Sequence, residues 1–257
     1  MRIILLIHAI VATALLSPTT AAFAQTPHGS YEALFEAAIN AITWDFHDDW
    51  AFTATSSGKE GDRVGRYDPR LPEDLRWTLI SIDGRVPTDE EAVEYADSRG
   101  DHHFGGDDDS DDDDNDDDDN DDNNAIDMVE PGSLELVEET DDYWLLSFVP
   151  TDDDEDDEDD DVGRKVLESM HGTVKIIKDG EYLAYVDIRN EKPIRPKFGV
   201  KMSKFLMRLA FGPAADDGPV VMQSMDFAIK LSAFVLVRVN EAESMAFSDF
   251  EYAGETR

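Results

Sequence analysis

The second half of the chain consists of short strand-like segments joined by turns. From Ser133 onward, seven segments are rich in β-branched, aromatic and other apolar residues: LELVEE, YWLLSFV, VLESMHGTVKIIK, EYLAYVDIR, VKMSKFLMRLAF, VVMQSMDFAIKLSAFVLVRV and SMAFSDFEYA. Turn-forming pairs such as Asp179-Gly180 and Asn240-Glu241 separate them. Because connections this short join antiparallel neighbours, the pattern predicts an antiparallel meander.

The N-terminal third has a mixed pattern of helices and strands. Apolar residues at helical spacing after Ser30 predict a helix through about Thr43. Thr88 and Glu91 match a capping box and predict a second helix. Three short strands are expected between these helices, at residues 50–55, 64–67 and 76–82. Because three strands are too few for a core of their own, we expect a single α+β domain over residues 25–257.

A short apolar segment opens the chain. Arg2 precedes an apolar run from Ile3 to Leu16, and Ala22-Phe23-Ala24 has the small-residue pattern of a signal-peptidase site. A bilayer span needs about 20 residues, so this run is too short to be one. We therefore predict a signal peptide over residues 1–24 and a periplasmic protein, with full secretion left open. The chain has no cysteine, which excludes a lipid anchor and thiol chemistry.

The composition is strongly acidic. Sixty Asp and Glu against 22 Lys and Arg give a net charge of −38. Much of it comes from the runs at 107–122 and 152–161, which predict disordered acidic loops over residues 105–125 and 151–162. We expect both loops to bind divalent cations diffusely. Nucleic acid and anionic membrane surfaces are poor partners for such a field, and no stable membrane insertion is expected. Adaptation to a salty habitat is the competing explanation for the remaining acidity.

The end of the first acidic run contains a calcium-loop pattern. Five oxygen-bearing residues occupy positions 1, 3, 5, 9 and 12 of an EF-hand-type loop: Asp119, Asp121, Asn123, Asp127 and Glu130. Asn124 stands where such loops carry glycine, and Pro131 blocks an exit helix. The alternative function is therefore an acidic calcium-binding envelope protein that uses residues 107–130, with Ca²⁺ as its cofactor.

Methionine and aromatic residues are concentrated in the meander. Six of them are candidates to line an apolar binding site: Phe205, Met207, Met225, Phe227, Trp144 and Phe148. Methionine adapts to irregular apolar ligands, although such residues also pack ordinary cores. Nucleophile-elbow, metalloprotease and phosphate-loop motifs are absent from the sequence, so no enzyme is predicted.

The order of elements resembles the LolA/LolB family of periplasmic lipoprotein carriers. The matching segments are RYDP at 66–69, RWTLISIDGRVPT at 76–88, the HGTVKI strand and the closing FSDFEY. The resemblance implies a strongly curved antiparallel sheet, an unclosed barrel whose concave face is covered by the N-terminal helices. It also implies a periplasmic carrier for lipid or acylated, lipoprotein-like cargo. A structural or assembly role at the envelope is a third hypothesis.

Overall fold

The structure is a computed structural model, and it describes residues 30–59, 61–100, 128–151, 165–234 and 237–254. The predicted signal peptide over residues 1–24 lies outside these ranges. So do the acidic loops predicted over 105–125 and 151–162, apart from Thr151.

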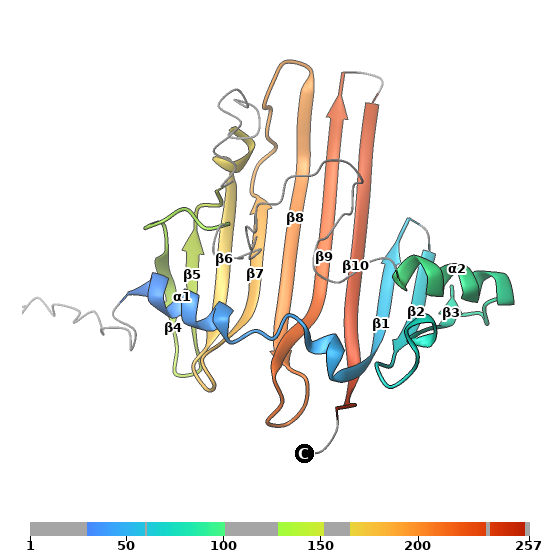
Figure 1. Cartoon of the computed structure of the whole chain (residues 1–257). Coiled ribbons are helices and arrows are strands. Elements are labelled where there is room, and N and C mark those ends of the chain that lie inside the picture. The colour runs from blue at the N-terminus through green and yellow to red at the C-terminus, as the bar shows by residue number, and fades with distance from the viewer. Residues whose placement is uncertain (1–29, 60, 101–127, 152–164, 235–236, 255–257) are drawn as a thin grey trace, which may run out of the picture.

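The described strands form one antiparallel sheet of ten strands (Figure 1). They are β1 (Trp50–Gly58), β2 (Gly61–Tyr67), β3 (Trp77–Ile82), β4 (Glu135–Glu139), β5 (Tyr143–Phe148), β6 (Met170–Ile177), β7 (Tyr182–Asn190), β8 (Val200–Pro213), β9 (Val220–Ala233) and β10 (Val237–Tyr252). Their order is β3-β2-β1-β10-β9-β8-β7-β6-β5-β4, so β3 and β4 are the two edges. The predicted antiparallel, unclosed sheet is confirmed.

Both predicted helices are present, as α1 (Tyr31–Asn40) and α2 (Asp89–Gly100). The Ser30 hydroxyl caps α1 by accepting a hydrogen bond from the Ala33 N–H at 3.1 Å. At α2 the Thr88 N–H donates to the Glu91 carboxylate at 2.8 Å, and the Glu91 N–H donates to the Thr88 hydroxyl at 3.3 Å. These reciprocal bonds are the predicted capping box. Two short 3₁₀ helices, η1 (Phe46–Asp48) and η2 (Glu73–Leu75), are also present.

The first three strands join the sheet through its last strand. β1 pairs with β10, and Ala54 lies opposite Phe247. After α1, the Thr43 N–H donates to the Val220 carbonyl at the start of β9, at 2.8 Å. These long-range contacts make the N-terminal strands an extension of the meander rather than a separate sheet.

One strand boundary differs from the prediction. The sequence suggested a break at Asn240-Glu241, but these residues lie inside β10, and the break follows Ala233 instead. Phe234 has a positive φ of 52°, and its N–H donates to the Gly199 carbonyl at 2.6 Å. The break was hidden because it falls within an apolar run that contains no glycine or proline.

Both helices lie on the same face of the sheet, which we call the helix face; the opposite side is the back face (Figure 1). Directly paired residues of neighbouring strands share a face, so the register assigns each side chain. The α1 cluster packs beneath α1; its core includes Leu34, Phe35, Trp144, Leu146, Phe148, Val174, Ile176, Leu183 and Phe211. The α2 cluster packs beneath η1 and α2; its core includes Phe46, Phe52, Tyr67, Trp77, Tyr95 and Phe247.

Candidate functional site

Four of the six predicted apolar-site residues lie together on the helix face of β8 and β9. Met207 on β8 lies opposite Phe227 on β9, and Phe205 lies opposite Ile229. The rings of Phe205 and Phe227 meet edge to face, with centroids 5.8 Å apart. Met225 lies two residues before Phe227 on β9, so its side chain is on the same face. We call Phe205, Met207, Met225, Phe227 and Ile229 the apolar strip.

The apolar strip lies between the two core clusters. Phe205 and Met207 pack against the edge of the α1 cluster, whereas Met225 lies opposite Met245, which packs against the α2 cluster. Phe227 and Ile229 belong to neither cluster, and the Met225 side chain is 38% exposed. The other four side chains of the strip are half-buried. Among the described residues, the strip is therefore a partly exposed apolar surface between the parts of the sheet that α1 and α2 cover.

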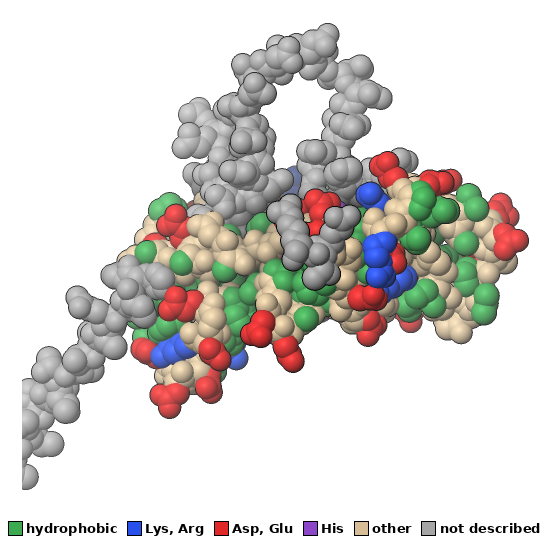
Figure 2. All heavy atoms as spheres, turned by 60° about the horizontal axis from the view of Figure 1, so that its bottom comes forward, with side chains coloured by type: hydrophobic (Ala, Val, Ile, Leu, Met, Phe, Trp, Pro, Cys, Tyr) green, Lys and Arg blue, Asp and Glu red, His purple; other side chains and the backbone are tan. Residues whose placement is uncertain are grey.

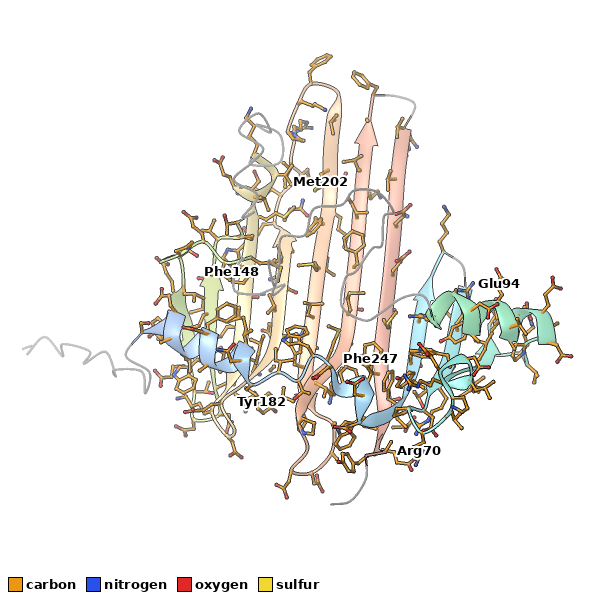
Figure 3. The ribbon with its side chains drawn as sticks, in the orientation of Figure 1. Arg70, Glu94, Phe148, Tyr182, Met202 and Phe247 are labelled. Atoms are coloured by element: carbon orange, nitrogen blue, oxygen red, sulfur yellow. The ribbon has the colours of Figure 1, made fainter. Side chains whose placement is uncertain are left out.

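The other two predicted residues lie in the covered core. Trp144 and Phe148 are on β5 beneath α1, and Phe148 is only 2% exposed (Figure 3). The Trp144 indole N–H donates to the Glu139 carboxylate at 3.2 Å. Phe148 lies directly over Gly172 on β6, where any side chain would collide with its ring. The structure thus separates these two residues from the apolar strip and gives them a packing role.

The α2 cluster is built from stacked aromatic rings. Phe52 on β1 stacks on Tyr67 with ring centroids 5.1 Å apart, and Tyr67 contacts Trp77 at 5.0 Å. Burial raises the pKa of both Tyr67 and Tyr95, so their phenols stay neutral at physiological pH. This half of the helix face is a closed core.

The apolar strip has a charged border on one side and an apolar continuation at one end. On β10, Glu243 lies opposite Phe227 and Glu241 lies opposite Ile229, and both glutamates are exposed. Towards the upper end of the sheet, Met202 pairs with Leu231, which pairs in turn with Val239 of β10. Figure 3 shows Met202 high on β8, beyond the level of α1. Met202 is only 8% exposed, whereas Leu231 and Val239 are half-buried. Leu231 and Val239 therefore continue the partly exposed apolar surface from the strip towards the ends of the strands.

Sequence reasoning missed this continuation, although a signal for it was present. In VKMSKFLMRL, apolar and basic residues alternate, which is typical of a strand with one apolar and one charged face. One extra residue between Met202 and Lys204 shifts the alternation, because the register slips there. The pattern alone could not place this irregularity.

The predicted calcium ligands fall almost entirely outside the described residues. Asp119, Asp121, Asn123 and Asp127 lie outside them, and Glu130 is exposed. The Glu130 N–H donates to the Val149 carbonyl at 2.9 Å, which fixes its backbone beside β5. Within the described ranges no group of three or more His, Cys, Asp or Glu is arranged to hold a metal ion. A specific calcium site thus stays a prediction from the sequence.

The described surface includes two hollows whose lining residues are mostly polar or charged. One, of about 730 Å³, lies along α2 and is lined by residues that include Asp89, Glu94 and Asp97. The other, of about 420 Å³, lies beside the start of β6 and the end of β7, and includes His171 and Glu191. No residue of the apolar strip lines either hollow.

The chain matches no protein-family model, no curated protein and no solved structure. The resemblance to the lipoprotein carriers therefore remains an interpretation of the sequence. In the part of the chain that the structure describes, neither helix is long and apolar enough to span a bilayer.

Proposed function

We propose that the protein is a periplasmic binding or carrier protein for lipid or acylated, lipoprotein-like cargo, and that the apolar strip holds the apolar chain. The observation that supports this proposal is the position of the strip. It places two phenylalanines, two methionines and an isoleucine on adjacent strands, between two closed cores, with only Phe205 and Met207 packed against the edge of one of them. A surface of this kind on a folded protein usually marks a binding site.

The dimensions of the apolar surface suit an acyl chain. From Met225 to Leu231 the helix face of β9 extends over six residues, or roughly 20 Å at about 3.3 Å per residue. One leaflet of a bilayer has a hydrocarbon depth of about 15 Å. A single extended chain could therefore lie along β9 with Phe227 and Ile229 beneath it.

The chemistry of the strip favours a binding role over catalysis. Methionine side chains are unbranched and polarizable, so they adjust to apolar ligands of different shape. The polar groups beside the strip are the exposed carboxylates of Glu241 and Glu243, which could orient a cationic or hydrogen-bonding head group.

The first test is whether the purified protein carries apolar chains. Native mass spectrometry and organic extraction should both reveal bound lipid, and a fluorescent long-chain fatty acid should bind to the delipidated protein. Phe227→Asp should remove at least 90% of this binding, because it places a carboxylate in the centre of the strip.

A matched control lies on the other face of the same strands. Leu206 neighbours Met207 on β8 but points to the back face, where it pairs with Ala228. Leu206→Asp should therefore leave fatty-acid binding unchanged. A protein that carries no lipid and binds no fatty acid would contradict the proposal, as would equal losses in the two variants.

A further inference from the structure

The upper ends of β8, β9 and β10 differ in charge from the rest of the molecule. We call residues 195–204 and 230–238, apart from 235 and 236, the strand tip. It carries six basic side chains: Arg195, Lys197, Lys201, Lys204, Lys230 and Arg238. The sequence has no Asp or Glu in residues 192–215 or in residues 227–240. A local excess of positive charge thus exists in a chain of net charge −38.

The strand tip also exposes large apolar side chains. Phe198 is 94% exposed and Phe234 is 67% exposed, and Val237 is half exposed. The two phenylalanines are held beside each other, because the Phe234 N–H donates to the Gly199 carbonyl at 2.6 Å and its ring lies against Gly199. Figure 1 shows these strand ends beyond the level of both helices. Exposed phenylalanines that belong to neither described core cluster are expected at a binding surface.

The bases of the strand tip have no acidic partners among the described residues. Elsewhere Arg66, Arg70, Arg85 and Lys178 each form an ion pair with a carboxylate. Within the described ranges no such ion pair is present at the tip. Lys204 lies directly opposite Lys230, and like charges at directly paired positions destabilise a sheet. Bases that repel each other and have no acidic partner in the described part of the chain favour an anionic partner.

The outer part of the strand tip lies apart from the acidic residues of β9 and β10. Ala233, at the upper end of β9, is seven residues from Asp226, or roughly 23 Å along the strand, whereas Lys230 is four residues from it, or roughly 13 Å. On β10, Arg238 is three residues from Glu241, or roughly 10 Å. The Debye length is about 8 Å at physiological ionic strength, so the field of these carboxylates is screened most strongly at the outer end of the tip.

We propose that the strand tip docks on an anionic membrane surface. Phe198 and Phe234 enter the head-group region, and the surrounding lysines and arginines contact lipid phosphates. This combination of exposed aromatic rings and cations is the one that interfacial membrane proteins use. Nucleic acid is the less suitable anion, because fully exposed phenylalanines at the end of a hairpin gain most from a partly apolar interface.

This docking goes beyond the proposed cargo binding. It would also determine which end of the apolar surface faces the membrane. Leu231 and Val239, which are half-buried beside the buried Met202, connect the apolar strip with the strand tip on the helix face. A tip resting on a membrane would therefore bring one end of the apolar surface to the lipids. The net charge of −38 predicts repulsion by anionic membranes, whereas the local charge of the tip predicts attachment.

Vesicle flotation tests the docking. The protein should be the chain from Gln25 onward, which contains every described residue and lacks the apolar run at 3–16. It should float with vesicles that contain phosphatidylglycerol and not with pure phosphatidylcholine vesicles. Binding should disappear at about 1 M salt, where the Debye length falls to about 3 Å.

Two variants separate the contributions of charge and of the exposed ring. Lys204→Gln combined with Lys230→Gln should weaken vesicle binding about twenty-five-fold, since each cation contributes about fivefold. Phe198→Ser should weaken it by roughly tenfold or more. The control Val86→Ser removes an 84% exposed apolar side chain from the segment before α2 and should change nothing.

The outcomes separate docking from cargo binding. The strip variant Phe227→Asp should still float, so failure of one proposal leaves the other standing. Equal binding to both vesicle types, or no binding to either, would overturn the docking proposal. A chain that ignores vesicles but binds a DNA duplex through Lys204 and Lys230 would also overturn it and identify a nucleic-acid surface.

Discussion

The lower and upper parts of β8, β9 and β10 differ in burial and in charge. At the lower end of β8, Phe211 is buried in the α1 cluster, and near the lower end of β10 Phe247 is buried in the α2 cluster. At the upper end, Phe198 and Phe234 are exposed, and the intervening bases have no described acidic partner. Figure 2 shows the molecule from its lower end, where acidic side chains are prominent among the described residues.

This contrast shows that neither residue type nor overall composition determines the role of a side chain. Phe148 and Phe227 are both helix-face phenylalanines of the meander, yet a helix covers one and not the other. Lysines paired with carboxylates, such as Lys178 with Glu139, hold the fold together, whereas Lys204 and Lys230 repel each other. The closed core clusters are therefore concentrated in the lower part, whereas the surfaces that we propose for binding lie above them.

The largest expected difference in stability is between variants of Phe148 and of Phe227. Phe148→Ala should lower the free energy of unfolding by about 3–5 kcal/mol, because it opens a cavity beneath α1. Phe227→Ala should cost only about 1 kcal/mol, because its ring belongs to neither core cluster. Urea denaturation of both variants measures the difference. Equal losses would mean that the strip is part of the core.

A second prediction tests how tightly the covered part is packed. Gly172→Ala should cost about 1–3 kcal/mol, because its new methyl group would collide with the Phe148 ring. The control is Gly58→Ala on β1, where the nearest atoms belong to the flexible, exposed side chain of Glu243. That variant should change stability by less than about 0.5 kcal/mol. Comparable effects at the two positions would contradict a tightly packed α1 cluster.

Sequence reasoning succeeded where the signals are local. Ser30 capping α1 and the Thr88–Glu91 capping box involve residues three positions apart, so the sequence displays them completely. The alternation of apolar and polar residues likewise identified the strands and placed Met207 and Phe227 among the candidates.

Sequence reasoning failed where distant segments decide the outcome. The pairing of β1 with β10 joins Ala54 to Phe247, and nothing near either residue indicates it. Trp144 and Phe148 were indistinguishable from the strip until α1 was seen to lie over them. The basic strand tip was concealed by the net charge, because Lys204 and Lys230 meet only when β8 and β9 pair.

Charge-reversal variants of the strand tip should change the stability of the sheet and the binding to vesicles in different ways. Lys230→Glu places opposite charges on directly paired residues of β8 and β9, so it should raise the free energy of unfolding by about 0.2–1 kcal/mol. The same change should weaken binding to anionic vesicles. Lys197→Glu makes an equal change of charge outside the strands and should weaken docking without the gain in stability. A Lys230→Glu variant that is less stable, or that docks unimpaired, would contradict this assignment.

The smallest effect concerns the cover that α2 provides. The Arg85 guanidinium donates to the Glu91 carboxylate at 2.9 Å, and the Thr88 N–H donates to it as well. These hydrogen bonds lower the pKa of Glu91 from 4.5 to about 2. The stabilisation of the folded state by the ionised Glu91 carboxylate is therefore complete above pH 4.5 and is lost as the pH falls towards 2. At neutral pH the first turn of α2 should exchange its amide hydrogens more slowly than in Glu91→Gln. This difference should shrink as the pH falls towards 2, where about half of the Glu91 carboxyls are protonated in the folded protein.

Amides of β8 near the strand tip provide the internal control for this measurement. Protonation of Glu91 acts on the start of α2, so exchange at residues 200–204 should be the same in both proteins at every pH. A difference that is undiminished at pH 2 would show that the Glu91 charge does not hold the helix start. A difference in amide exchange at residues 200–204 would show that the covered and exposed parts of the sheet are coupled. Such coupling would contradict their description as separate parts.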